Sequence, residues 1–147
     1  TIESLVGALG DMPEVPFWDY CAYEVFLYKK AQIFNLQDAF PKTEYIGLIN
    51  NWPVYIQEKC IDTYDFCSYT TKAQRSEATN ATKISLKYPR LDLNWFTTYF
   101  LINGQNKSND LLDFLEEYNI NDLHKGNLGF SAIDSRPLII DFSGFHM

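Results

Sequence analysis

The stretch NDLHKGNLGF, residues 121–130, places a carboxylate, an imidazole, an amide and two glycines within ten positions. Asp122 and Asn127 are five residues apart, and Asp141 follows 14 residues after Asn127, at the end of the apolar segment PLII. Asp, Asn and Gly are also common in turns. The stretch therefore predicts either a plain hairpin turn or a binding site.

The residue types in this stretch suit phosphoryl transfer, which mainly requires positioning and charge neutralisation. A carboxylate can accept the proton of the attacking hydroxyl, while an amide oxygen and a second carboxylate hold Mg²⁺ against the phosphates. In protein kinases, the Asp of the catalytic loop is followed five positions later by Asn, and a later strand ends in Asp-Phe-Gly. Asp122, Asn127 and Asp141 have the spacing for these three roles.

Two segments carry a family resemblance. DLHKGN resembles the Asp-Leu-His-x-x-Asn loop of aminoglycoside-phosphotransferase-like and other protein-kinase-like enzymes, and LIIDFSGF resembles their metal-binding strand. The pair is most similar to small kinase-like proteins of bacteriophages and mobile elements. The resemblance implies ATP and Mg²⁺ as cofactors, Asp122 and His124 as catalytic-loop residues, and Asn127 and Asp141 as metal ligands. His124 alone could equally be a structural side chain of a turn.

The resemblance extends upstream more weakly, over residues 19–62. FPKTEYIGLINNWPVYIQEKC resembles the hairpin that leads to the hinge of such proteins, which would put Gln57 and Glu58 where the nucleotide base hydrogen-bonds to the backbone. The preceding helix would carry the ion-pairing glutamate, for which Glu24 is the candidate. Since no lysine partner is evident, Glu24 can also be an ordinary exposed helix residue.

The chain departs from the family at several positions. Ile120 and Asn121 stand where a His or Arg precedes the catalytic Asp, and Ser143 replaces the glycine of Asp-Phe-Gly. There is no glycine-rich loop, no Lys before Lys29, and no activation segment after Asp141. Three interpretations stay open: a reduced phosphotransferase, a fragment whose glycine loop and lysine lie upstream, or a pseudokinase.

Length and composition indicate one globular domain over residues 1–147, and the resemblance implies that it is a kinase-like unit. The chain is 46% apolar and 16% aromatic, which is enough for a well-filled core. Its net charge of −7 disfavours nucleic acid as a partner and suits a bound magnesium ion or a basic protein. Cys21, Cys60 and Cys67 have no metal-ligand spacing, so they are expected to be buried thiols in a reducing compartment.

Localisation and partners follow from what the sequence lacks. No apolar run approaches the ~20 residues needed to cross a bilayer, and the start does not resemble a signal peptide. A cytoplasmic protein with no membrane partner is expected, in the host cytoplasm if it is phage-encoded. Besides nucleotide binding, two roles stay open: a noncatalytic phage protein that binds and inhibits a host protein, and a structural virion protein.

Hydrophobic periodicity predicts an α+β fold in which helices surround a small antiparallel sheet. The resemblance implies that this fold is a reduced protein-kinase-like domain. Polar residues 62–83 are expected to form a flexible loop or a ragged helix, and residues 91–102 a helix or a strand. The remaining predicted helices cover residues 2–9, 19–35 and 108–120, and the predicted strands cover 44–49, 54–59, 129–133 and 137–141.

Helix and hairpin ends are predicted from local chemistry. Asp19 and Ser108 are the expected N-cap residues, with Asp110 in the first turn after Ser108. The first hairpin is expected to turn through residues 50–53. The expected buried face of the second helix consists of Leu111, Leu112, Phe114 and Leu115.

Overall fold

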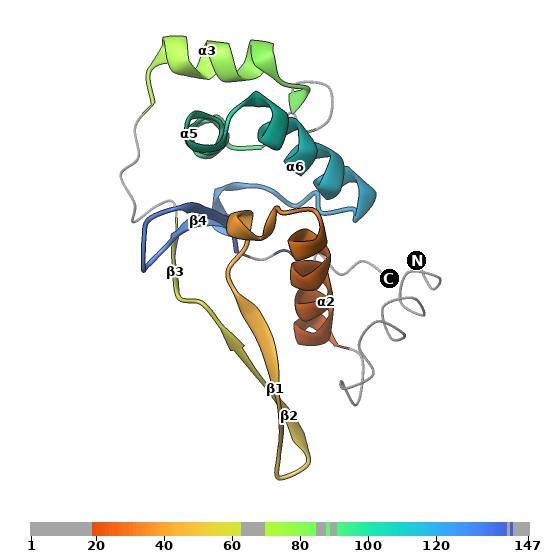
Figure 1. The fold of residues 1–147 in the computed structure, drawn as a ribbon. Helices are drawn as coiled ribbons and strands as arrows, with labels where there is room; N and C mark the ends of the chain where they lie inside the picture. The colour runs from red at the N-terminus through yellow and green to blue at the C-terminus, as the bar shows by residue number, and fades with distance from the viewer. Residues whose placement is uncertain (1–18, 63–69, 85–87, 89–90, 141, 143–147) are drawn as a thin grey trace.

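The computed structural model of the protein describes residues 19–62, 70–84, 88, 91–140 and 142. Within these ranges the chain forms an α+β fold, as predicted, with small antiparallel sheets and helices (Figure 1). The predicted helix over residues 2–9 lies outside the described residues. The helices are α2 (Tyr20–Ile33), α3 (Lys72–Ala81), α5 (Leu93–Asn103) and α6 (Gln105–Glu117), with short 3-10 turns η1 (Gln37–Ala39) and η2 (Lys125–Asn127). The strands are β1 (Thr43–Ile49), β2 (Trp52–Gln57), β3 (Cys60–Asp62), β4 (Leu128–Ser131) and β5 (Pro137–Ile139).

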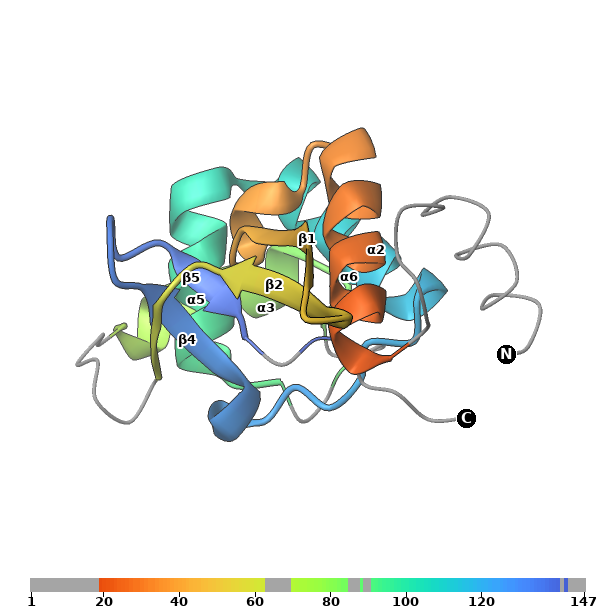
Figure 2. The ribbon, with the colours of Figure 1, turned by 90° about the horizontal axis from the view of Figure 1, so that it is seen from below.

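Helix α2 begins where the sequence predicts. The Asp19 carboxylate accepts a hydrogen bond from the backbone N–H of Ala22 at 2.8 Å, so it satisfies a donor that the first helical turn leaves free. The helix ends at Ile33, and Asn35 then takes a left-handed conformation with φ 58°. The helix packs beside the base of the β1–β2 hairpin (Figure 2).

Strands β1 and β2 confirm the predicted hairpin, but the predicted four-residue connection is wrong. Ile49 pairs directly with Trp52, so only Asn50 and Asn51 form the turn. Both asparagines have positive φ, 53° and 67°, as a two-residue type I′ turn requires, and asparagine adopts this region more readily than most residues. Figure 1 shows this hairpin projecting away from the helices.

Helix α3 occupies the centre of the polar segment that was predicted to be a loop or a ragged helix. Its start is a capping box: the Thr71 hydroxyl accepts from the Gln74 backbone N–H at 3.1 Å, and the Gln74 side chain accepts from the Thr71 N–H at 2.9 Å. Two backbone donors are thus satisfied by two residues three positions apart. Of the two predicted alternatives, residues 72–81 adopt the helix, whereas residues 63–69 of the polar segment lie outside the described ranges.

Removal of this cap should lower the stability of the protein measurably. Thr71→Ala is expected to lower the free energy of unfolding by about 1 kcal/mol, because the N–H of Gln74 loses its acceptor. Thr71→Ser keeps the hydroxyl and is the matched control. Urea unfolding followed by circular dichroism tests the pair, and equal stability of the two variants would contradict the capping role.

Helices α5 and α6 follow one another across Gly104. The alternative of a strand over residues 91–102 is wrong, because the Asp92 carboxylate caps α5 through the N–H of Trp95 at 3.1 Å. Helix α6 begins at Gln105, so the predicted cap at Ser108 is also wrong: its buried hydroxyl donates to the Gly104 carbonyl at 2.7 Å. Gly104 has φ 87°, a conformation that favours glycine.

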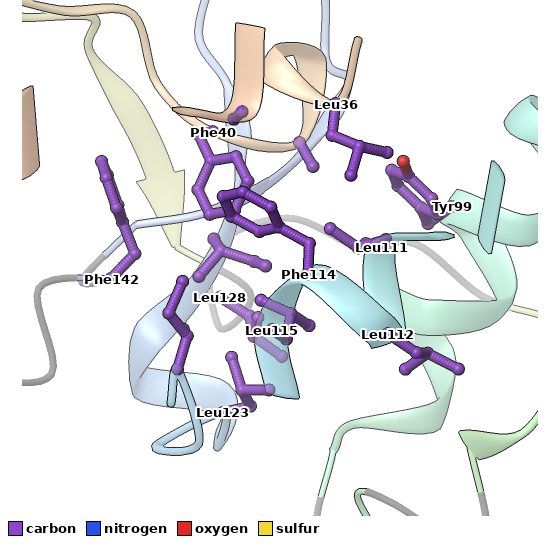
Figure 3. Close-up of a cluster of buried hydrophobic side chains, with 14 of the residues drawn as sticks. Leu36, Phe40, Tyr99, Leu111, Leu112, Phe114, Leu115, Leu123, Leu128 and Phe142 are labelled. Carbon is purple, nitrogen blue, oxygen red and sulfur yellow. The ribbon is translucent and has the colours of Figure 1, made fainter. Parts of the chain in front are cut away.

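The core lies between helices α2, α5 and α6, the η1 segment and the second sheet. The four residues predicted as the buried face of α6 are all buried. Phe40 links this face to the chain end, with ring centroids 5.7 Å from Phe114 and 5.0 Å from Phe142 (Figure 3). The β3–β4–β5 sheet is antiparallel throughout, and its two C-terminal strands agree with the predicted ones to within a few residues.

Candidate functional site

The connection between α6 and β4 turns sharply and brings three predicted site residues together. After Asn119, with φ 55°, the buried side chains of Ile120 and Leu123 anchor the connection to the core. Figure 3 shows Leu123 beside the α6 side chains. Asp122 lies between these two anchors and keeps 57% of its side chain exposed. Its carboxylate is therefore accessible on a fixed backbone.

Asn127 closes this loop with its side-chain amide. The residue is only 8% exposed, and its Nδ2 donates to the Asp122 backbone carbonyl at 2.7 Å. Because a carbonyl can only accept, this bond orients the NH₂ toward Asp122 and the oxygen Oδ1 away from it. Among the described residues, no group donates a hydrogen bond to that oxygen. The loop thus presents one oriented amide oxygen.

His124 supports the turn and approaches Asp122. Its Nδ1 accepts from the Gly126 N–H at 3.0 Å, so the neutral imidazole carries its proton on Nε2. That Nε2 lies 3.5 Å from the Asp122 carboxylate and 3.4 Å from the Asn127 amide nitrogen. A Cβ at position 126 would lie 2.7 Å from the ring, so a larger residue there would displace the exposed His124 side chain from this position. The residues that form this turn are therefore also the residues of the candidate site.

The end of the last strand lies against this loop. The Ile140 N–H donates to the Asn127 carbonyl at 2.9 Å, which extends the pairing of Leu128 with Ile139 by one step. Ile140 is the residue before Asp141 in the sequence, and Phe142 after it is fully buried. Asp141 itself lies outside the described residues, so its role as a metal ligand stays a prediction.

The described residues contain no group of three or more His, Cys, Asp or Glu side chains that could hold a metal ion. The two cysteines in the described ranges differ in exposure. Cys21 is exposed, so its predicted burial is wrong, and Cys60 is partly buried, whereas Cys67 is outside the described ranges. Burial, reinforced by the nearby Glu58 carboxylate, raises the pKa of Cys60 to about 11, which keeps the thiol protonated at neutral pH.

Glu24 and Gln57, two of the predicted cofactor-binding residues, are neighbours in space. The Gln57 amide nitrogen donates to the Thr43 hydroxyl at 2.9 Å and lies 3.4 Å from a carboxylate oxygen of Glu24. These contacts link α2 to the end of the first hairpin. The proposed roles of both residues toward a nucleotide stay predictions.

Glu58, the third of these residues, is part of a buried ion pair. Its side chain is 6% exposed and accepts two hydrogen bonds from the Arg136 guanidinium, at 2.5 and 3.0 Å. The Ser131 hydroxyl and the backbone N–H of Lys42 also donate to it. Arg136 in turn donates from Nε to the Asp38 carbonyl at 3.1 Å. The pair therefore connects four segments of the chain.

The electrostatics of Glu58 follow from these contacts. Burial alone would raise its pKa, but the hydrogen bonds from Arg136, Ser131 and Lys42 together outweigh burial and lower the pKa below its ordinary value. The Glu58 backbone N–H is engaged as well, donating to the Lys42 carbonyl at 2.8 Å. Glu58 was among the predicted site residues, but Arg136 was not, because the two residues are 78 positions apart and no sequence motif includes both.

The Asp122–Asn127 loop and Glu58 lie at opposite ends of the β4–β5 hairpin. Asn127 and Ile140 lie at its open end, whereas Ser131 and Arg136 lie at its turn, next to Glu58. Four residues of extended chain separate the ends, or about 13 Å. One strand pair thus connects the Asp122–Asn127 loop with the segment that contains Glu58.

Comparisons with other proteins identify no relative: no protein family, curated protein or solved structure matches this chain. No helix in the described part of the chain is long and apolar enough to cross a membrane.

Proposed function

We propose that the Asp122–Asn127 loop binds the phosphates of a magnesium nucleotide, as part of a reduced protein-kinase-like fold. The observation that carries this proposal is the Asn127 amide, whose nitrogen is held by the Asp122 carbonyl and whose oxygen receives no hydrogen bond from the described residues. Oxygen ligands of this kind are what Mg²⁺ prefers. Asn127 also pairs with the residue that precedes Asp141, the second candidate ligand.

The other groups of the loop fit complementary roles. The Asp122 carboxylate is exposed and close to the His124 ring, so an acceptor hydroxyl could reach it and lose its proton there. A bound magnesium ion would neutralise phosphate charge. The order of elements also supports the proposal: α2, the first hairpin, helices α5 and α6, the loop, and a strand before Asp141 follow one another as the resemblance implies.

Isothermal titration with ATP and MgCl₂ tests the proposal. Asp141→Asn should weaken binding roughly tenfold or more, because a charged ligand is lost, by analogy with the 10- to 100-fold cost of disturbing the surroundings of a metal. Asp122→Asn should bind nucleotide nearly as well as the wild type, since a base contacts the acceptor and not the phosphates. Chelation of magnesium should abolish the heat signal.

Asp113→Asn is the matched control, because it removes the same charge from an exposed position of α6. Its affinity should equal that of the wild type. Absence of binding at millimolar nucleotide by a protein with native circular dichroism would overturn the proposal, as would equal affinities of Asp141→Asn and the control. Either result would favour the noncatalytic interpretation, in which the chain acts by binding a host protein.

A further inference from the structure

The junction between α5 and α6 contains an asparagine that is followed directly by glycine. Asn103 is the last residue of α5, and Gly104 separates it from Gln105, the first residue of α6. No other Asn-Gly pair occurs in the 147 residues. Asparagine is a thermolabile residue, and a following glycine has no side chain to hinder attack on the asparagine amide. By local chemistry, Asn103 is therefore the most reactive asparagine of the chain.

The reaction open to this pair is deamidation through a cyclic imide. The backbone nitrogen of Gly104 loses its proton to solvent and forms a bond with Cγ of Asn103, while the bond between Cγ and Nδ2 breaks and ammonia leaves. Water then opens the five-membered ring. Cleavage of the bond to Cγ gives aspartate, and cleavage of the bond to the backbone carbonyl carbon gives isoaspartate. Water is the only co-reactant, and no oxidant or reductant takes part.

The folded junction holds both reacting groups away from this reaction. The Gly104 N–H donates to the Phe100 carbonyl at 2.8 Å, so its nitrogen is engaged in the last turn of α5. The Asn103 Nδ2 donates to the Tyr99 carbonyl at 3.0 Å, which directs the side chain back along α5 and away from Gly104. Reacting atoms must come within about 3–3.5 Å of each other. Both hydrogen bonds must therefore break before the ring can close.

The junction also has the features of a segment that opens locally. Gly104 is exposed, and α6 begins there without a side-chain cap. Leu101 and Ile102 are 49% and 61% exposed, so little apolar burial holds the last turn of α5 in place. Tyr99, by contrast, lies in the buried cluster of the core (Figure 3). Opening can thus be confined to the residues around Gly104 while the core stays packed.

We propose that Asn103 is a modification site that deamidates through local opening of the α5–α6 junction. Modification weakens the junction in turn. The aspartate product has no donor for the Tyr99 carbonyl and places a carboxylate oxygen against it. The isoaspartate product carries the chain through Cγ, which adds one carbon to the backbone between the two helices. The reaction does not depend on nucleotide binding.

Peptide mapping by mass spectrometry tests the proposal, after incubation at mildly alkaline pH without urea, with urea below the unfolding transition, and with urea above it. Deamidation of Asn103 should be roughly tenfold or more slower in the folded protein than in the unfolded chain, because two hydrogen bonds protect it. Below the transition, the rate should rise with urea less steeply than global unfolding does, since local opening exposes less surface.

Asn103→Gln is the matched control for the reaction. It keeps a side-chain amide, but ring closure would need six members, so it should give far less product at this position. Equal deamidation rates of Asn103 in the folded and the unfolded wild type would overturn the proposal. A urea dependence of the folded-state rate as steep as that of global unfolding would also overturn it.

The effect of modification on the junction is tested with Asn103→Asp, which reproduces the aspartate product. This variant should unfold at a lower urea concentration than the wild type. Asn106→Asp adds the same charge at an exposed position in the first turn of α6, where a carboxylate is tolerated, and it should unfold like the wild type. Equal urea midpoints of the two variants would overturn the proposed weakening of the junction.

Discussion

Replacement of Trp95 by alanine is expected to lower the free energy of unfolding by about 4 kcal/mol, the largest effect of any single substitution considered for this chain. The side chain is 1% exposed and stacks on Tyr99 with ring centroids 5.8 Å apart. Its indole N–H donates to the carbonyls of Gly129 and Leu138, both at 3.1 Å. Truncation therefore leaves a cavity between α5 and the second sheet, and removes the donor for two buried carbonyls.

The same substitution at Trp52 is the matched control. Trp52 is largely exposed, so Trp52→Ala should change the unfolding free energy by no more than about 0.5 kcal/mol. Urea unfolding of the two variants, followed by circular dichroism, compares the two losses. Similar losses at positions 52 and 95 would contradict the described core.

Arg136→Ala is expected to lower the free energy of unfolding by about 3 kcal/mol at neutral pH. The substitution leaves the Glu58 carboxylate buried without the guanidinium that compensates its charge, and such a loss typically costs about 3–5 kcal/mol. Arg136 is 25% exposed, so water can partly replace it and the lower end of that range applies. Lys42→Ala is the control, because its ion pair with Glu44 is exposed on both sides and worth about 0–1 kcal/mol.

Acid pH distinguishes loss of the ion pair from loss of packing. The pKa of Glu58 is lowered in the folded protein, so its stabilisation is present above the ordinary glutamate value of about 4.3 and is lost as pH falls through the folded value. In Arg136→Ala, burial raises the pKa of Glu58 without the opposing hydrogen bonds from Arg136. The unfolding free energy of the variant therefore falls less on acidification than that of the wild type. The difference in unfolding free energy between wild type and variant should therefore become smaller as the pH falls from about 5 to about 3. If the difference in unfolding free energy stays constant over this range, the substitution has removed only the packing of the Arg136 side chain.

Features governed by neighbouring residues were predictable from the sequence. Asp19 caps α2 three residues from its donor, and the apolar spacing of residues 111–115 gave the correct buried face. The same holds for the loop of the candidate site: Asp122, His124 and Asn127 lie within six positions, so a tight turn necessarily brings them together. In each case the spacing of residues close together in the sequence was sufficient to predict the contact or the buried face.

Features that depend on distant residues or on competing local signals were not predictable. Ser108 has the chemistry of an N-cap, yet Gly104 allows α6 to begin earlier, and the hydroxyl then bonds within the helix. The ion pair of Glu58 with Arg136, which lies 78 residues away in the chain, had no signal in the sequence, and the role of Glu58 near a nucleotide base stays a prediction. No periodicity connects two such positions, because their contact arises only when the whole chain folds.

The long span between these partners has a consequence for the order of folding during synthesis. The first hairpin closes over a two-residue turn, and hairpins form within about 1–10 µs. The second sheet, by contrast, must wait for β4 and β5, and Arg136 reaches back to Asp38, 98 residues earlier. At about 5–20 residues per second, a ribosome needs several seconds to deliver those strands. A nascent chain therefore displays Trp52 and its neighbours well before the rest of the fold can form.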